Sequence, residues 1–216
     1  MIFGKIEYLN LLPFHVFMKR FSRSSQQKAI MNYKKNVPAK INSEFTNRRV
    51  DAAFISSIAA KKYKHINLGI IAKKEVQSVL IIPSRSDKSD KESASSNVLA
   101  KILQQHGEVL IGDKALLYSL KNSDYIDLAK EWNEKHHLPF VFALLCYHKD
   151  KKVYKKIEKE FLKRSYKIPA YLLEKAVKKT GIDAKDIINY LTLISYRLDT
   201  KAKLGLKKFY KEAKKI

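Results

Sequence analysis

The first sixty residues alternate short apolar runs with helical patterns, and this alternation limits the folds that the chain can adopt. Met1–Leu9 has the pattern of a strand, and Pro13–Phe21 has the pattern of a helix with one apolar face. Pro38 then opens another helix, which Val50–Ile55 follows as a compact apolar strand. Strands that alternate with helices in this way predict an α/β protein with a mainly parallel sheet.

The rest of the chain continues this order until it becomes helical. Val79–Ile82 is a continuous apolar run, which is typical of a strand buried on both faces. Val109–Ile111 is another run that leads into a helix, and Pro139–Cys146, the most apolar stretch, predicts a central strand. Beyond Lys149 the apolar residues recur at helical spacing, so we expect only helices there.

We expect two α/β lobes with a ligand cleft between them, because the apolar runs form two groups joined by two crossings. Residues 1–78 and 144–216 would form one lobe from the N-terminal strands and the C-terminal helices. Residues 79–143 would form the second, inserted lobe. The turns between strands and helices would face the cleft at Asn10, Ser56, Ser95, and Gly112 with Asp113. Such a hinged arrangement can close over a small ligand and exclude water.

Asn10 stands between the first apolar run and the proline that opens the first helix. Its amide can donate and accept hydrogen bonds at once, which suits a ligand that carries both carboxylate and hydroxyl groups. Unpaired N–H groups at the start of a helix would add to such a site. Alternatively, Asn10 only caps the helix that Pro13 begins. The residues by themselves leave both interpretations open.

Serines stand at two further turns of the predicted fold. Ser56 and Ser57 end an apolar strand directly before a helix, and Ser93–Ser96 precede another helical pattern. Hydroxyl groups at a helix start either cap the helix or bind an anion, and capping is the commoner use. The polar stretch Ser84–Ser96 has the composition of a linker, which is typical of a flexible surface loop.

The formal net charge of +23 raises the hypothesis of nucleic-acid binding. However, residues 149–216 alone carry 21 basic and 8 acidic residues, on helices with apolar stripes, which indicates solvated helix faces. No zinc finger, RNA-recognition signature or homeodomain-like pattern accompanies the lysines, so specific nucleic-acid binding is not expected. The milder expectation is a positive surface that attracts an anionic metabolite.

Cysteine usage and hydropathy indicate the compartment. The single cysteine, Cys146, excludes a disulfide framework, and no Cys/His cluster has the spacing of a zinc site. Neither a signal peptide nor an apolar run near the roughly 18 residues of a membrane span is visible. We therefore expect a cytoplasmic protein with no bound metal, while its oligomeric state stays open.

Six short motifs occur in order along the chain. They are Tyr8-Leu9-Asn10-x-x-Pro13, Val50-Asp51-Ala52-Ala53 leading to Ser56-Ser57, Ser78-Val79-Leu80, Ser93-x-Ser95-Ser96-x-x-Leu99, Ile111-Gly112-Asp113-x-Ala115-Leu116 and Leu138-Pro139-Phe140-Val141-Phe142-Ala143. With these motifs the chain resembles, over essentially its whole length, the MqnA/MqnD group of enzymes of the futalosine route to menaquinone. The resemblance implies the two-lobed type II periplasmic-binding-protein fold without an export signal.

The fifth and sixth motifs are similar to the versions in MqnA, chorismate dehydratase, rather than in MqnD, 1,4-dihydroxy-6-naphthoate synthase. The resemblance implies that chorismate loses water to give 3-enolpyruvylbenzoate in menaquinone biosynthesis, with no metal or organic cofactor. Ser95 departs from the family pattern, which usually has threonine there, and the inserted lobe is short. The alternatives are the activity of the sister enzyme, 1,4-dihydroxy-6-naphthoate synthase, and a non-catalytic cytoplasmic small-anion-binding protein of the same fold.

The resemblance also implies roles for the residues at the turns. Asn10 would be catalytic and would orient the C4 hydroxyl or the enolpyruvyl group of chorismate. The substrate-binding residues would be Ser56, Ser57, Ser78, Ser95, Ser96, Gly112 and Asp113. Asp113 could instead anchor the turn at Gly112, and His15 could be a packing residue or face the site. Because the other groups are neutral, we expect a carboxylate of the substrate itself to take the ring proton.

Overall fold

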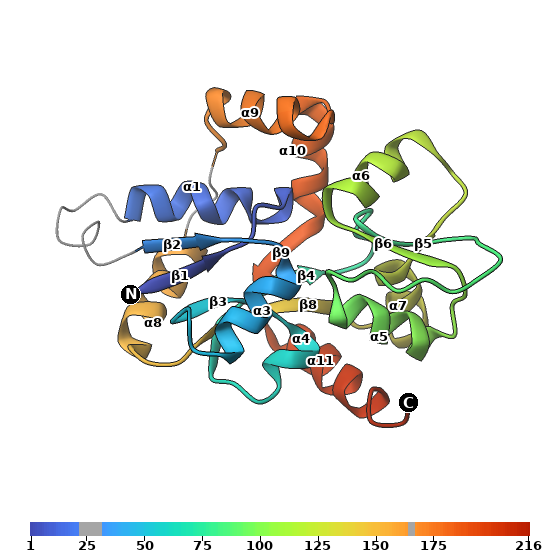
Figure 1. Ribbon diagram of the computed structural model, residues 1–216, viewed down its shortest axis with the longest axis horizontal. Helices are drawn as coiled ribbons and strands as arrows, with labels where there is room; N and C mark the ends of the chain where they lie inside the picture. Colours follow the sequence, from blue (N-terminus) through green and yellow to red (C-terminus); the bar gives the residue numbers. More distant parts are fainter. Residues whose placement is uncertain (22–31, 164–166) are drawn as a thin grey trace.

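The computed structural model describes residues 1–21, 32–163 and 167–216, whose strands form two sheets that lie side by side (Figure 1). The large sheet has the order β2-β1-β3-β8-β4-β9, and the small sheet has the order β6-β5-β7. The large sheet contains β1 (Ile2–Lys5), β2 (Asn32–Lys35), β3 (Ala52–Ser56), β4 (His65–Ala72), β8 (Phe140–Tyr147) and β9 (Ile194–Arg197). The small sheet contains β5 (Val79–Ile82), β6 (Glu108–Ile111) and β7 (Ile126–Asp127).

Helices cover both sheets. On the large sheet these are α1 (Leu12–Phe21), α3 (Pro38–Thr46), α4 (Ser57–Ala60), α8 (Lys151–Leu162), α10 (Ala184–Leu193) and α11 (Thr200–Glu212), and α9 (Ala170–Thr180) packs against α10. The small sheet carries α5 (Ala94–Leu103), α6 (Gly112–Lys121) and α7 (Leu128–His136). In Figure 1, α1 lies above β1 and β2, whereas α3, α4 and α11 lie below the sheet. Helix α9 contacts α6, so this helix of the large-sheet part touches the small-sheet part.

Strand directions differ from the predicted mainly parallel sheet. Only the β1–β2 and β1–β3 pairs of the described strands are parallel, while β8 is antiparallel to both β3 and β4. Strand β9 is antiparallel to β4, and the small sheet is antiparallel throughout. The reason is topological: β4 leaves the large sheet toward the small one, and β8 returns from it, so the two neighbours run in opposite directions. The prediction of a central strand at Pro139–Cys146 is confirmed, because β8 lies between β3 and β4.

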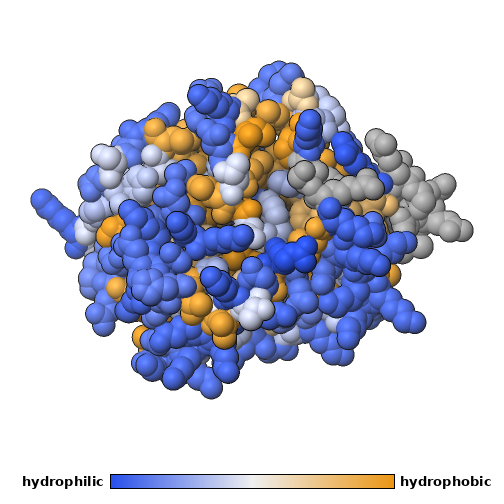
Figure 2. Space-filling view, turned by 180° about the vertical axis from the view of Figure 1, so that it is seen from behind, coloured by the Kyte–Doolittle hydropathy of each residue, from blue (hydrophilic) through white to orange (hydrophobic). Residues whose placement is uncertain are grey.

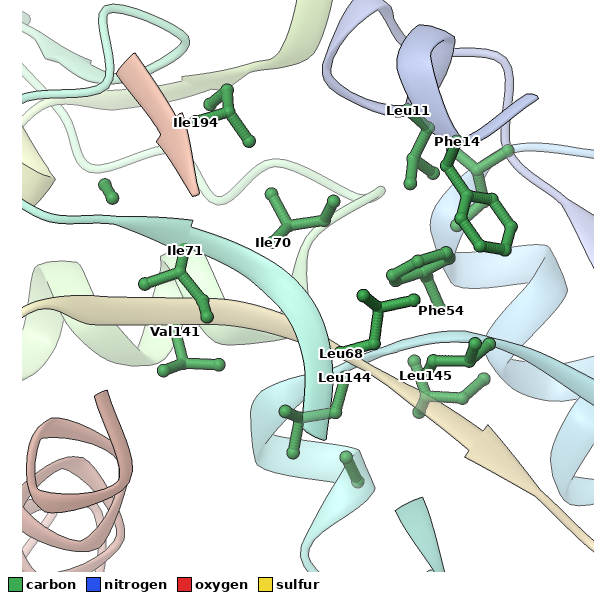
Figure 3. Packing of buried hydrophobic residues seen from close by; sticks show 14 of the residues in the cluster. Leu11, Phe14, Phe54, Leu68, Ile70, Ile71, Val141, Leu144, Leu145 and Ile194 are labelled. Carbon is green, nitrogen blue, oxygen red and sulfur yellow. The ribbon is translucent and has the colours of Figure 1, made fainter. Parts of the chain in front are cut away.

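A cluster of phenylalanine rings holds α1 against the large sheet. The rings of Phe14 and Phe54 meet edge to face with their centroids 5.0 Å apart, and Phe161 of α8 lies 5.3 Å from Phe14. Figure 3 shows Phe14 and Phe54 facing each other beside Leu11 and Leu68. Aromatic pairs of this kind add about 0.5–1.5 kcal/mol each to the burial of their surface. The cluster therefore fixes the start of α1, where Asn10 lies.

Two predicted elements are wrong in their extent. The first strand ends at Lys5, and Leu9–Leu11 forms a short 3-10 helix, η1, because the Leu9 N–H bonds to the Asp113 carboxylate instead of a neighbouring strand. Residues 194–197 were expected to be helical but form β9 on the free edge of β4. Pairing with an available strand edge supplies these residues with hydrogen bonds that a longer α10 would otherwise have provided.

Asp127 ties the crossing from β4 to β5 to the small-sheet part. One carboxylate oxygen accepts the N–H groups of Val76 and Gln77 at 2.9 and 2.6 Å. The other oxygen accepts the N–H groups of Ala129 and Lys130 at 2.9 and 3.1 Å and so caps α7. The side chain is buried, so these four bonds replace its solvation.

Polar side chains dominate the face of the molecule seen from behind (Figure 2). On the face shown in Figure 2, hydrophilic side chains cover most of the area and smaller apolar areas lie between them. Among the described residues, no helix combines the length and the apolar character needed to cross a membrane.

Candidate active site

A cavity lies where the two sheets meet. It is bounded by η1, the end of β3, the start of β5, the segment before α5, the end of β6 and the middle of β8. Its polar lining consists of Tyr8, Asn10, Ser56, Ser78, Glu92, Ser93 and Ser96. The other lining residues are apolar apart from the backbone of Gly112, and they include Phe54 and Phe142. The combination of apolar walls with a few convergent polar groups is typical of a site for a small molecule.

The structure brings five of the eight predicted site residues to this cavity and leaves three outside it. Asn10, Ser56, Ser78, Ser96 and Gly112 line the cavity. The three residues that do not line it, Ser57, Ser95 and Asp113, make hydrogen bonds within the protein. The turns that form the cavity come from distant parts of the sequence, and their strand ends meet between the two sheets.

Asn10 lies inside η1, whose N-cap position is occupied by Tyr8. It is therefore not the residue that caps this helical turn. The Tyr196 hydroxyl donates to the Asn10 carbonyl oxygen at 2.7 Å, which holds the backbone in place. The Asn10 side chain interacts with the Tyr190 hydroxyl, and Asn10 lines the cavity. Two tyrosines from the C-terminal part of the chain thus contact Asn10, Tyr196 at its backbone and Tyr190 at its side chain.

Tyr190 links Asn10 to Ser78. Its hydroxyl lies 2.9 Å from the Ser78 Oγ, and both side chains are 2% exposed. Burial raises the pKa of Tyr190 far above its ordinary value, so the hydroxyl keeps its proton and can donate it in a hydrogen bond. Sequence reasoning missed Tyr190, because its helix contributes to the site only after packing against η1.

Ser56 is held by Asn42 of α3. The Asn42 amide donates to the Ser56 Oγ at 2.9 Å, and the Ser56 N–H donates to the Asn42 Oδ1 at 3.2 Å. These two bonds leave the hydroxyl proton of Ser56 available to an acceptor in the cavity. Asn42 is a second residue that sequence reasoning missed.

Ser57 and Ser95 join the starts of α4 and α5. Their hydroxyl oxygens lie 3.0 Å apart, and the Ile58 N–H donates to the Ser95 Oγ at 3.1 Å. Both side chains are fully buried. Their hydroxyls are therefore used in a contact between the large-sheet and small-sheet parts, and Ser93 is the residue that caps α5.

Asp113 anchors η1 to α6. Its Oδ1 accepts the Leu9 N–H at 2.9 Å, and burial raises the pKa of the carboxyl group above its ordinary value. Gly112 beside it has φ +70°, and a Cβ there would lie 2.8 Å from the Tyr8 ring. Glycine is needed at this turn both for its backbone conformation and for the approach of the ring.

Glu92 supplies the carboxylate of the cavity lining. The Tyr8 hydroxyl donates to Glu92, and burial together with this carboxylate raises the pKa of Tyr8 far above its ordinary value. The segment Ser84–Ser96, which we expect from its composition to be a flexible surface loop, is tied by hydrogen bonds close to this residue. Asn97 binds the backbone of Asp90 through two hydrogen bonds of 3.0 and 2.7 Å, which hold the segment in place. The position of Glu92 directly before the Ser93 motif is the feature of the sequence that could have identified it as a site residue.

His15 packs outside the cavity. Its Nε2 lies 2.7 Å from the Ile6 carbonyl oxygen, which requires a proton on that nitrogen. Burial lowers the pKa of the ring to about 4, so the ring is neutral at pH 7. The structure therefore supports the interpretation of His15 as a packing residue and not the interpretation that it faces the site.

Comparison with known structures agrees with this architecture. A protein from Archaeoglobus fulgidus, AF1704, has a TM-score of 0.74 at 15% identity and covers 99% of this chain and 96% of its own. The aliphatic sulphonate-binding protein SsuA from Escherichia coli has a TM-score of 0.54 at 12% identity, covering 98% and 86%. SsuA from Xanthomonas axonopodis pv. citri has a TM-score of 0.53 at 10% identity, covering 98% and 92%. At these identities the likeness shows the fold alone, which is that of the periplasmic binding proteins.

Sequence comparison adds the family. A family model described as menaquinone biosynthesis matches residues 1–108 and 100–215. The chorismate dehydratase of Campylobacter jejuni is 49% identical over 220 residues, which cover 100% of this chain and 99% of the relative. Both matches run through all the segments that form the cavity. The chain therefore belongs to the menaquinone biosynthesis family and, within it, to the MqnA group.

Proposed function

We propose that this protein is a chorismate dehydratase, a hydro-lyase that converts chorismate to 3-enolpyruvylbenzoate and water in menaquinone biosynthesis. The observation that carries the proposal is 49% identity to a chorismate dehydratase over the whole chain. The cavity supports it, because amide and hydroxyl groups surrounded by apolar walls suit a small ring that carries carboxylate and hydroxyl groups. The expected location is the cytoplasm, and the expected partner is the small-molecule substrate.

The reaction removes the proton at C3 and the hydroxyl at C4 of chorismate and leaves an aromatic ring. Because aromatisation favours the product, the main task of the protein is to hold the substrate in a reactive geometry. Asn10 orients the C4 hydroxyl or the enolpyruvyl group, since it lines the cavity and its side chain interacts with Tyr190. Ser56, Ser78 and Ser96 supply hydroxyl groups to the carboxylates of the substrate.

Three of the proposed binding residues take other roles in this scheme. Ser57 and Ser95 join α4 to α5, and Asp113 holds η1 in place. They would therefore support the shape of the cavity without touching chorismate.

The acceptor of the C3 proton is a carboxylate of the substrate in this proposal. Glu92 is the protein group that could replace it, because its carboxylate lines the cavity. Glu92→Gln distinguishes the two. Substrate-assisted elimination predicts a variant that keeps kcat within about tenfold, whereas a base at Glu92 predicts a loss of at least the 10²-fold that general base catalysis contributes. Loss of turnover with intact chorismate binding would make Glu92 the base.

The test of the proposed function is incubation of the purified protein with chorismate, followed by chromatographic detection of 3-enolpyruvylbenzoate. Asn10→Ala should lower kcat by about 10²-fold, because the substrate loses its orienting group. Asn189→Ala is the matched control, since Asn189 is exposed on α10. Binding of chorismate without product in the wild-type protein would favour the non-catalytic alternative.

A further inference from the structure

Ser56 occupies the N-cap position of α4, but its hydroxyl group does not cap that helix. The side chain is 9% exposed and lines the cavity. Its Oγ accepts a hydrogen bond from the Asn42 amide at 2.9 Å. Within residues 1–21, 32–163 and 167–216, no group accepts the proton of this hydroxyl. That proton is therefore available to a ligand in the cavity.

The direction of the hydrogen bond between Asn42 and Ser56 follows from the chemistry of the two groups. The Ser56 backbone N–H can only donate, so the Asn42 atom that lies 3.2 Å from it must be the amide oxygen. The NH₂ group of Asn42 then faces the Ser56 Oγ, and this group can only donate. The Ser56 hydroxyl thus accepts from Asn42 and donates elsewhere.

Asn42 lies behind Ser56 and does not line the cavity. It belongs to α3, whose Ile41 and Phe45 are fully buried in the core. Helix α3 contacts β3, the strand that ends at Ser56. The packing of the helix on this strand holds Asn42 in place, so Asn42 affects a ligand through Ser56 and not by touching it.

Ser96 shows the same polarity on the small-sheet side of the cavity. Its Oγ accepts a hydrogen bond from the Ser93 hydroxyl at 2.7 Å, and its N–H donates to the Ser93 Oγ at 3.2 Å. The contact between Ser57 and Ser95 brings the starts of α4 and α5 side by side. The hydroxyl groups of Ser56 and Ser96 are thus both arranged as donors toward the cavity that they line.

We propose that Asn42 is a positioning residue, which fixes Ser56 as a hydrogen-bond donor and so makes the cavity select a carboxylate at this point. The inference rests on the proposed function, because chorismate carries two carboxylates. An ionised carboxylate has only acceptor atoms, whereas an amide or a hydroxyl group also presents a proton. Hydrogen bonds to a charged group are also stronger than those between neutral groups.

Two substitutions of Asn42 test this polarity. In Asn42→Asp the introduced carboxylate accepts the Ser56 proton, and Ser56 then turns lone pairs toward the substrate. We expect KM for chorismate to rise about 10–100-fold, because a hydrogen bond to a charged group is lost, with a smaller change in kcat. Asn42→Leu leaves the hydroxyl free among three staggered positions, which should raise KM about threefold. A role in packing alone predicts the opposite order, since aspartate has nearly the shape of asparagine.

The matched control for the added charge is Asn47→Asp, at the exposed C-cap position of the same helix. Its KM should stay within twofold of the wild-type value, because the new carboxylate has no bond to Ser56. A double-mutant cycle tests the route of the effect. Ser56→Ala should raise KM about 10–100-fold, and adding Asn42→Leu to it should have no further effect.

Inhibitor binding measures the selection without turnover. The probes are 3-hydroxybenzoate and 3-hydroxybenzamide, which differ in the group that Ser56 would contact. The wild-type protein should bind the benzoate at least about tenfold more tightly, and Asn42→Asp should remove most of this preference, whereas Asn47→Asp should keep it.

The outcomes separate the two proposals. A wild-type protein that does not turn over chorismate overturns the proposed function, and the inhibitor comparison still decides the role of Asn42. If chorismate is turned over but Asn42→Asp is no weaker than Asn42→Leu, or if Asn42→Asp leaves the inhibitor preference unchanged, the positioning role alone is overturned.

Discussion

Tyr190→Phe tests whether the buried tyrosine positions the Asn10 amide. The substitution removes one oxygen atom from a 2% exposed side chain and keeps the packing of the ring. The Ser78 Oγ, 2.9 Å away, and the Asn10 side chain both lose a partner. The hydroxyl keeps its proton in the wild-type protein because burial raises the pKa of Tyr190 far above its ordinary value, so the bonds do not depend on pH in the neutral range.

The expected loss of stability is about 1–3 kcal/mol, since buried partners are left unsatisfied. For a chain of this length, that corresponds to a decrease of roughly 2–10 °C in Tm. The expected loss in kcat is about 10–100-fold with little change in KM, because a misplaced Asn10 still permits binding. Thermal unfolding and steady-state kinetics with chorismate measure the two effects.

Tyr63→Phe is the matched control, because its hydroxyl binds the Thr46 Oγ1 at 3.0 Å in a more exposed place away from the cavity. It should change neither kcat nor KM by more than twofold. A Tyr190→Phe protein that loses stability as expected but keeps the wild-type kcat would refute the positioning role. A Tyr190→Phe protein whose kcat and Tm change no more than those of the Tyr63→Phe protein would refute it as well.

Three further predictions concern the surroundings of the cavity. His15 has a pKa of about 4 when folded and an ordinary value of 6.5 when unfolded, so the unfolded chain binds more protons between these values and stability falls as the pH drops. Denaturant unfolding should show about 2 kcal/mol less stability at pH 5 than at pH 7 from this residue, and His15→Gln should lack that part. Gly112→Ala should cost about 1–3 kcal/mol and raise KM, because φ is +70° and the Cβ would meet the Tyr8 ring; wild-type values for both would contradict the tight contact. Ser95→Ala should cost about 1–3 kcal/mol in thermal unfolding, because the Ile58 N–H and the Ser57 hydroxyl lose their partner. Ser95→Thr should keep most of that stability, and equal losses in the two variants would rule out the hydroxyl as the cause.

The sequence was sufficient to place the turns at the cavity but not to give the direction of every side chain. Asn10, Ser56 and Ser96 stand next to apolar strands or helix starts, which is local information, whereas Ser78 is expected only from the family resemblance. Ser95 is one residue from Ser96, and the helical rotation of about 100° between neighbours turns its hydroxyl toward α4. Which of the two hydroxyls reaches the cavity depends on the position of α4, and the sequence around Ser95 and Ser96 does not reveal that position.

The contacts that sequence reasoning missed join residues far apart in the chain. Ser78 and Tyr190 are separated by 112 positions, and Tyr8 and Glu92 by 84. Neither pair has a spacing that marks it, because the packing of whole helices brings the partners together. The same reason explains β9, whose residues pair with β4 although their apolar pattern also fits a helix.

The four hydrogen bonds of Asp127 bind Val76 and Gln77 to the N-terminus of α7, although both residues precede the first strand of the small sheet. If the two parts of the molecule rotate against each other, we expect this connection to bend at residues 73–75, between the last residue of β4 and Val76. Such a rotation would have to break the hydrogen bond between Ser78 and Tyr190, because Tyr190 belongs to α10.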